Sequence, residues 1–89
     1  MDNIDRVKPF YKVTVKVKNK HKAFWVNVLE LASSFIHLKG AEIEETSNAG
    51  TLEEAKALLE TNNQVEKYYP WDSVVEIDLK RFLKSTQTQ

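Results

Sequence analysis

A stretch of strict alternation near the start of the chain constrains its fold more than any other feature. Between Phe10 and Lys18, the apolar side chains of Tyr and Val alternate with those of Lys and Thr. This two-residue period predicts a strand that buries one face and exposes the other. The polar segment Asn19–Lys22 follows it and predicts a hairpin that pairs this strand with the next one in antiparallel fashion.

Two further apolar runs predict strands that extend the sheet. The segment Phe24–Leu31 is apolar on both faces, as expected for a strand that is covered on both sides or bends around a small barrel. The segment Phe35–Glu45 changes its apolar phase at Gly40. A glycine at a phase change predicts a β-bulge, which bends a strand and returns apolar side chains to the core.

The second half of the chain predicts one helix and two short strands. Thr51 and Glu54 have the spacing of a capping box, which predicts a helix over Leu52–Glu60. Its apolar stripe is expected to pack on the sheet and consists of Leu52, Ala55, Leu58 and Leu59. Pro70–Ser73 predicts a turn between the last two strands, because proline has no amide hydrogen for a ladder. After this turn, the residues predicted to face the core are Val75, Ile77 and Leu79.

These elements predict an α+β fold that is mainly β. It is either a small, strongly bent antiparallel sheet or an SH3-like barrel, with one helix inserted before the last strands. Residues 1–84 are expected to form a single domain and residues 85–89 a disordered tail. The absence of cysteine excludes disulfides, a zinc ribbon and a thiol nucleophile. No apolar run predicts a signal peptide or a membrane span, so a soluble, cytoplasmic protein is expected.

The strand pattern, the phase change at Gly40 and the final segment Pro-Trp-Asp-Ser-Val-Val-Glu-Ile resemble the small SH3-like barrels of the Sm-like group. The resemblance covers about residues 10–45 and 65–79. The chain departs from the family because it lacks a helix before the first strand and places its helix between the third strand and the last. The family's RNA-binding motif is not recognisable, so no binding residue is carried over. The resemblance implies assembly into rings by the pairing of edge strands.

Charge is distributed unevenly along the chain, although 13 basic and 13 acidic residues cancel. Residues 1–39 have a net charge of +5 and residues 40–89 a net charge of −5. If folding places these halves on different faces, two copies have complementary poles and can associate head to tail. If the halves interleave, the poles vanish.

The sequence contains no motif that predicts catalysis, a cofactor or a metal ion. Phosphate-binding glycine loops, metalloprotease motifs and nucleophile elbows are all missing, so an enzyme is not expected. His21, in the predicted turn, and His37, in a predicted strand, could act as general bases only beside a nucleophile or a carboxylate. Glu42, Glu44 and Glu45 diverge along a strand and predict a solvated face rather than a cation site.

Aromatic residues supply the candidate partner contacts, since such side chains are enriched at interface hot spots. The candidates are Tyr68, Tyr69, Trp71 and Trp25. Trp71 is predicted to lie in the core, whereas Tyr68 and Tyr69 should point to opposite faces of a strand, which exposes at least one of them. We therefore predict a non-catalytic, self-associating module that acts stoichiometrically on a protein or a small ligand, like the regulators and inhibitors of phages and mobile elements.

The alternative is a small barrel that binds RNA or a single-stranded nucleic acid through lysines of the first strand and hairpin. These residues are Lys12, Lys16, Lys18, Lys20 and Lys22. Tyr11, Phe24 and Trp25 lie nearby in the sequence and could stack on bases. The same lysines have a simpler interpretation, because lysine commonly protects a strand at the edge of a sheet from aggregation.

Overall fold

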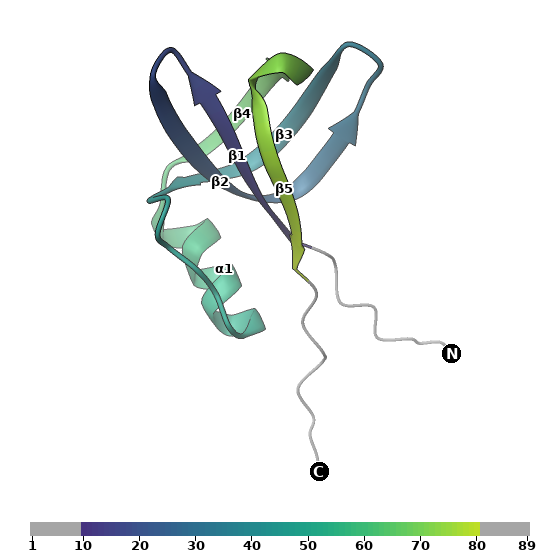
Figure 1. The fold of residues 1–89 in the computed structure, drawn as a ribbon. Helices are drawn as coiled ribbons and strands as arrows, with labels where there is room; N and C mark the ends of the chain where they lie inside the picture. Colours follow the sequence, from purple (N-terminus) through teal and green to yellow (C-terminus); the bar gives the residue numbers. More distant parts are fainter. Residues whose placement is uncertain (1–9, 81–89) are drawn as a thin grey trace, which may run out of the picture.

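One antiparallel sheet of five strands forms the frame of the computed structural model, which describes residues 10–80 (Figure 1). The strands are β1 (Phe10–Val17), β2 (Lys20–Leu31), β3 (Phe35–Ile43), β4 (Gln64–Pro70) and β5 (Val74–Lys80). Their order across the sheet is β4-β3-β2-β1-β5. The predicted mainly β class of α+β fold is confirmed. The predicted tail, residues 85–89, and both ends of the predicted domain lie outside the described residues.

The sheet is open but bent. β4 and β5 form its two edges, and no pairing joins them within residues 10–80, so the barrel is not closed. Only the short 3-10 helix η1 (Trp71–Ser73) connects them. The four peptide steps from Pro70 to Val74 reach at most about 15 Å. A flat sheet of five strands would separate its edge strands by about 19 Å, so the sheet must curl to bring its edges together at η1.

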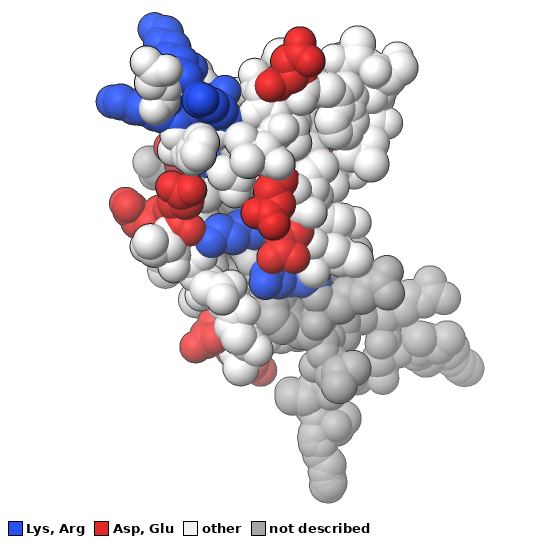
Figure 2. All heavy atoms as spheres, viewed as in Figure 1, with Lys and Arg blue, Asp and Glu red and all other residues white. Residues whose placement is uncertain are grey.

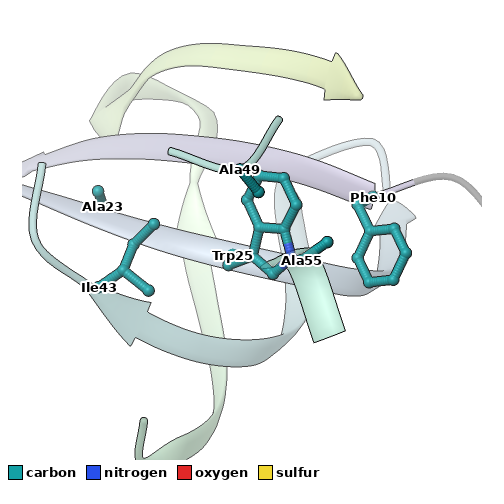
Figure 3. Packing of buried hydrophobic residues seen from close by; sticks show 6 residues of the cluster. All are labelled: Phe10, Ala23, Trp25, Ile43, Ala49 and Ala55. Carbon is teal, nitrogen blue, oxygen red and sulfur yellow. The ribbon is translucent and has the colours of Figure 1, made fainter. Parts of the chain in front are cut away.

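The bent sheet buries apolar side chains on both faces. Its inner face receives side chains from all five strands, which are the buried Val13, Val15, Phe24, Val26, Ile36 and Leu38 and the partly buried Val65, Tyr69, Val74 and Ile77. Its outer face is covered at one end by the helix α1 (Leu52–Thr61) and the loop before it. There, Trp25 of β2 lies among Phe10, Ala49 and Ala55 (Figure 3). β2 is therefore covered on both sides in its first half, which is one of the two predicted alternatives.

The helix α1 begins at the predicted capping box. The backbone N–H of Glu54 donates to Thr51 Oγ1 over 3.2 Å, and the backbone N–H of Thr51 donates to the Glu54 carboxylate over 3.2 Å. The predicted apolar stripe packs on the outer face of the sheet through Leu52, Ala55, Leu58 and Leu59. Among the described residues, no helix has the length and apolar character needed to cross a membrane.

A bulge occurs at the predicted place in the sheet, but its extra residue lies on the neighbouring strand. The β2–β3 register passes from Val26 opposite Gly40 to Val28 opposite Lys39, which leaves Asn27 as the inserted residue. A Cβ atom on Gly40 would overlap the carbonyl oxygen of Trp25 and lie 2.7 Å from the Cα atom of Val26. The assignment of the bulge to Gly40 itself is therefore wrong. The glycine lets β2 approach closely while β2 carries the bulge.

The first hairpin is tighter than predicted. Lys18 and Asn19 alone form the turn, since Val17 pairs with Lys20. Lys18 adopts a φ of 58°, in the left-handed region. His21 consequently lies in β2 and not in the turn, because the two-residue turn lets the ladder continue to its tip.

The last strand contributes less to the core than predicted. The β1–β5 register shifts between Thr14 and Val15, so Val74 pairs with Val15 and packs on the inner core. Of the three residues predicted to face the core, only Ile77 packs there. Val75 is left out of the register and is 53% exposed, and Leu79 near the end of the edge strand is 45% exposed.

Replacement of Gly40 by alanine tests the close approach of β2 and β3. We expect Gly40→Ala to lower the free energy of unfolding by about 3 kcal/mol or more, since the new methyl group would meet backbone atoms that cannot move aside. Urea denaturation followed by circular dichroism would measure the loss. The control is Gly50→Ala, because a Cβ atom there lies 3.4 Å from the flexible Glu54 side chain. Equal stability of the two variants would contradict this account of Gly40.

Candidate functional site

The bulge at Asn27 divides the outer face of the sheet into a covered and an uncovered part. α1 packs on Ala23 and Trp25, before the bulge, and it lies at the opposite end of the molecule from the β2–β3 hairpin (Figure 1). Beyond the bulge, no helix formed by residues 10–80 covers the outer face. We call this region the uncovered patch, and its residues are Val28, Glu30, Phe35, His37, Glu66 and Tyr68.

His37 is the centre of the uncovered patch. Its Nδ1 atom lies 3.1 Å from Glu30 Oε1, and its Nε2 atom lies 2.8 Å from Glu66 Oε2. The ring of Tyr68 stacks on the imidazole, with a centroid distance of 4.3 Å and an interplanar angle of 6°. Strand register creates this arrangement, because His37 pairs with Glu30 of β2 on one side and with Tyr68 of β4 on the other.

The geometry favours a positively charged imidazole. A carboxylate only accepts hydrogen bonds, so both ring nitrogens of His37 must carry a proton to donate to Glu30 and Glu66. The hydrogen bond to Glu30, followed by that to Glu66, raises the pKa of His37 above its ordinary value of 6.5, against an opposing effect of desolvation. His37 therefore keeps its proton to a higher pH in the folded protein than in the unfolded chain.

The same geometry leaves neither ring nitrogen of His37 free. His37 does lie beside carboxylates, but a protonated ring with both nitrogens engaged cannot accept a proton as a general base. Glu30 and Glu66 bind opposite sides of the ring and do not converge on a common point. In the part of the chain that the structure describes, no group of three His, Cys, Asp or Glu residues could hold a metal ion. His21 makes an exposed 3.5 Å contact with Glu45.

Tyr68 and Tyr69 point to opposite faces of β4, as predicted. Tyr68 is 60% exposed and contacts the edge of the Phe35 ring at a centroid distance of 5.7 Å. Tyr69 packs against Phe24 on the inner core. Its burial, with a smaller effect of Glu42, raises the pKa of the Tyr69 hydroxyl. Tyr68 is therefore the tyrosine available to a partner.

The two tryptophans exchange the roles that the sequence predicted. Trp71 is 36% exposed rather than buried, because η1 lies at the end of the sheet, where the Trp71 Nε1–H donates to the carbonyl of Ala32 over 2.9 Å. Trp25 is fully buried and stacks on Phe10 at 5.6 Å under α1, so its prediction as a partner contact is wrong (Figure 3). The helix covers Trp25 because the outer face before the bulge is the helix-binding face.

The five lysines of the nucleic-acid hypothesis do not form one surface. The ammonium group of Lys12 donates to the carbonyls of Glu45 and Ser47 over 2.6 and 2.8 Å and so fastens the loop before α1 to the sheet. Lys16 shares the outer face with Lys12, whereas Lys20 and Lys22 share the phase of the buried Phe24 on the other face.

Two further parts of that hypothesis are also corrected. β1 lies between β2 and β5, so its lysines do not protect an edge strand. Phe24 and Trp25 are fully buried and cannot stack on bases, and Tyr11 packs against the inner core.

The oppositely charged halves of the chain interleave. β5 of the acidic half runs beside β1 of the basic half, where Asp78 pairs with Lys12. Glu42, Glu44 and Glu45 are exposed, in agreement with the predicted solvated face. Figure 2 nevertheless shows one region of uninterrupted positive charge at the upper left, over the β1–β2 hairpin.

Comparisons of the chain with protein-family models, with curated proteins and with solved structures found no match. The Sm-like resemblance therefore stays a prediction, and the function has to be argued from the surface itself.

Sequence reasoning missed most of the uncovered patch. It singled out Tyr68 and His37 but not Glu30, Phe35 or Glu66. No spacing motif marks these residues, because seven residues separate His37 from Glu30 and 29 separate it from Glu66. Only the register of three neighbouring strands brings them together. The sequence feature that could have indicated this patch was Phe35, an aromatic residue directly after the Ser33-Ser34 turn.

The raised pKa of His37 makes stability depend on pH in a defined direction. Protonated His37 stabilises the folded protein through its hydrogen bonds to Glu30 and Glu66. This stabilisation is fully present below pH 6.5, the pKa expected in the unfolded chain, and is lost as the pH rises through the higher pKa of the folded protein. Imidazole titration by NMR should show the raised pKa of His37, and denaturation at several pH values should show the loss of stability. In the Glu30→Gln/Glu66→Gln variant the pKa should return towards 6.5. An unchanged pKa in that variant would contradict the assignment.

Proposed function

We propose that this protein is a non-catalytic binding module that associates with a second copy of itself through the uncovered patch and regulates a protein target stoichiometrically. One observation carries the proposal. Of seven large apolar side chains exposed in residues 10–80, three belong to the uncovered patch, namely Val28, Phe35 and Tyr68. Trp71 in η1 and Leu31, which has the phase of the inner face, lie at the same β2–β3 end of the sheet. Single exposed apolar residues are normal on a protein surface, but a concentration of them marks an interaction site.

The aromatic members of this surface are held in place before any partner binds. Tyr68 is stacked on His37 and contacts Phe35, and the indole of Trp71 is tied to the Ala32 carbonyl. A side chain that is already ordered loses less conformational entropy on association. Tyr and Trp are also the residues most enriched among binding hot spots. This pre-organised surface supports binding rather than turnover as the function.

The charges around the patch favour a second copy as its occupant. On this part of the outer face, the carboxylates of Glu30 and Glu66 are balanced by Lys39 and by protonated His37. Two such surfaces can approach without like-charge repulsion, as an interface between identical copies requires. A domain of 89 residues buries a modest fraction of its surface, so association adds stability that its core does not supply.

Tyr68→Ala tests this proposal, with Leu79→Ala as the matched control. Both residues are exposed, at 60% and 45%, but Leu79 lies near the far end of β5, away from the patch. We expect Tyr68→Ala to weaken self-association by tenfold or more, about the effect of losing a hot-spot aromatic residue, and Leu79→Ala to leave it unchanged. Light scattering over a concentration series would measure both. Raising the pH through the pKa of His37 should also weaken association, because each copy then gains a net negative charge at the interface.

Three outcomes would contradict the proposal. A protein that stays monomeric at every concentration has no such interface. Equal weakening by Tyr68→Ala and Leu79→Ala would point to general destabilisation. An oligomer indifferent to Tyr68→Ala would instead favour pairing of the edge strands β4 and β5, the mode that the Sm-like resemblance implies.

A further inference from the structure

The tip of the β1–β2 hairpin is a second surface, distinct from the uncovered patch. Four lysines occur within seven residues, with no acidic residue among them, and these are Lys16, Lys18, Lys20 and Lys22. Figure 2 shows basic side chains gathered at one projecting corner of the molecule, where the β1–β2 hairpin lies. Within residues 10–80, the acidic side chain that contacts this segment is Glu45, which lies 3.5 Å from His21 and does not pair with a lysine.

Lys18 occupies a backbone position that is unfavourable for it. Its φ of 58° lies in the left-handed region, where Gly is relaxed and a long side chain is strained. Two-residue hairpin turns favour Gly or Asn at such a position. The chain instead has a charged residue at the tip of the hairpin. Backbone strain of this kind clusters at functional sites, so it supports a role for the charge itself.

The hairpin carries its lysines on both faces of a two-stranded ribbon. Lys16 pairs with His21 and faces the outer side, while Lys22 pairs with Val15 and, with Lys20, faces the inner side. On the inner side an open hollow of about 490 Å³ is lined by Val17, Lys18, Asn19, Lys20 and Lys22. Positive charge therefore projects to either side of the ribbon as well as from its tip.

We propose that this hairpin binds the phosphate backbone of duplex DNA by entering the major groove. That groove is about 12 Å wide and admits a two-stranded β-ribbon. Lysines on both faces of such a ribbon reach the phosphates that line both sides of the groove. Lysine contacts to phosphate carry no sequence information, so the binding is independent of sequence.

Duplex DNA fits this hairpin better than a single strand or an RNA duplex does. Proteins that hold single strands stack the bases on aromatic side chains. The aromatic residues nearest the tip, Phe24 and Trp25, are fully buried. The major groove of an RNA duplex is too deep and narrow for side chains to read. The proposal goes beyond self-association and does not depend on it, because the uncovered patch lies at the other end of β2.

Fluorescence anisotropy with a labelled 20-base-pair DNA duplex tests this site. Four phosphate contacts predict a salt slope of about −3.6 in log K against log salt, so affinity should fall about 100-fold between 50 and 200 mM salt. Lys20→Gln/Lys22→Gln should weaken binding at low salt by about tenfold or more and roughly halve the slope. The matched control is Lys56→Gln/Lys80→Gln, which removes the same charge from α1 and the far end of β5 and should bind like the unmodified protein.

Lys18→Gly separates the role of the charge from that of the fold. Relief of the left-handed strain should raise the melting temperature, while loss of one phosphate contact should lower DNA affinity and reduce the salt slope by about one. If Lys18 has only a structural role, Lys18→Gly should bind DNA with unchanged affinity. Tyr68→Ala should keep binding DNA, which distinguishes failure of this site from failure of the self-association interface.

Four results would overturn the proposal. These are no binding to the duplex at 50 mM salt, equal affinities of the hairpin and control variants, tighter binding to a single strand of the same length, and binding confined to vesicles of anionic lipid.

Discussion

The close approach of β2 and β3 at Gly40 is the constraint on which the rest of the structure depends. Because Gly40 has no side chain, the backbone of β2 can approach it and insert Asn27 as a bulge. A bulge bends its strand and changes which residues face each side. The 12 residues of β2 form a first half that α1 covers and a second half that it leaves uncovered. Without the bulge, β2 could not bend enough to form both halves in a sheet whose edge strands are joined by only three residues.

Local sequence rules predicted the elements well because each element is specified by its own residues. Alternation identified β1, the Thr51–Glu54 capping box located the start of α1, and Pro70 marked the turn into η1. These signals report hydrogen bonding and solvent contact within a few neighbouring residues. The same rules failed where long-range packing decides. Trp25 was expected to contact a partner and Trp71 to lie in the core, yet α1 covers Trp25 and Trp71 remains partly exposed at the end of the sheet.

Lys12 shows why the candidate site was harder to predict than the fold. Its alternation with apolar residues correctly placed it on one face of β1, and a lysine on such a face is ordinarily solvated. Its ammonium group instead binds two carbonyls of a loop more than 30 residues away. The Glu30–His37–Glu66 arrangement depends in the same way on the register of three strands. Which strands pair is a property of the whole sheet, so no spacing along the chain reveals such contacts.

The two proposed surfaces lie at opposite ends of β2 and can act without disturbing one another. Eight residues of strand separate Lys22 from Glu30, a path of about 26 Å at the usual rise. The two surfaces share no residue, so a substitution in one leaves the contacts of the other in place. Association through the uncovered patch would use none of the hairpin lysines, so both hairpins of a dimer would stay available for DNA. Two weak phosphate-binding hairpins linked in this way would hold one DNA molecule more tightly than either alone, because the second contact becomes intramolecular.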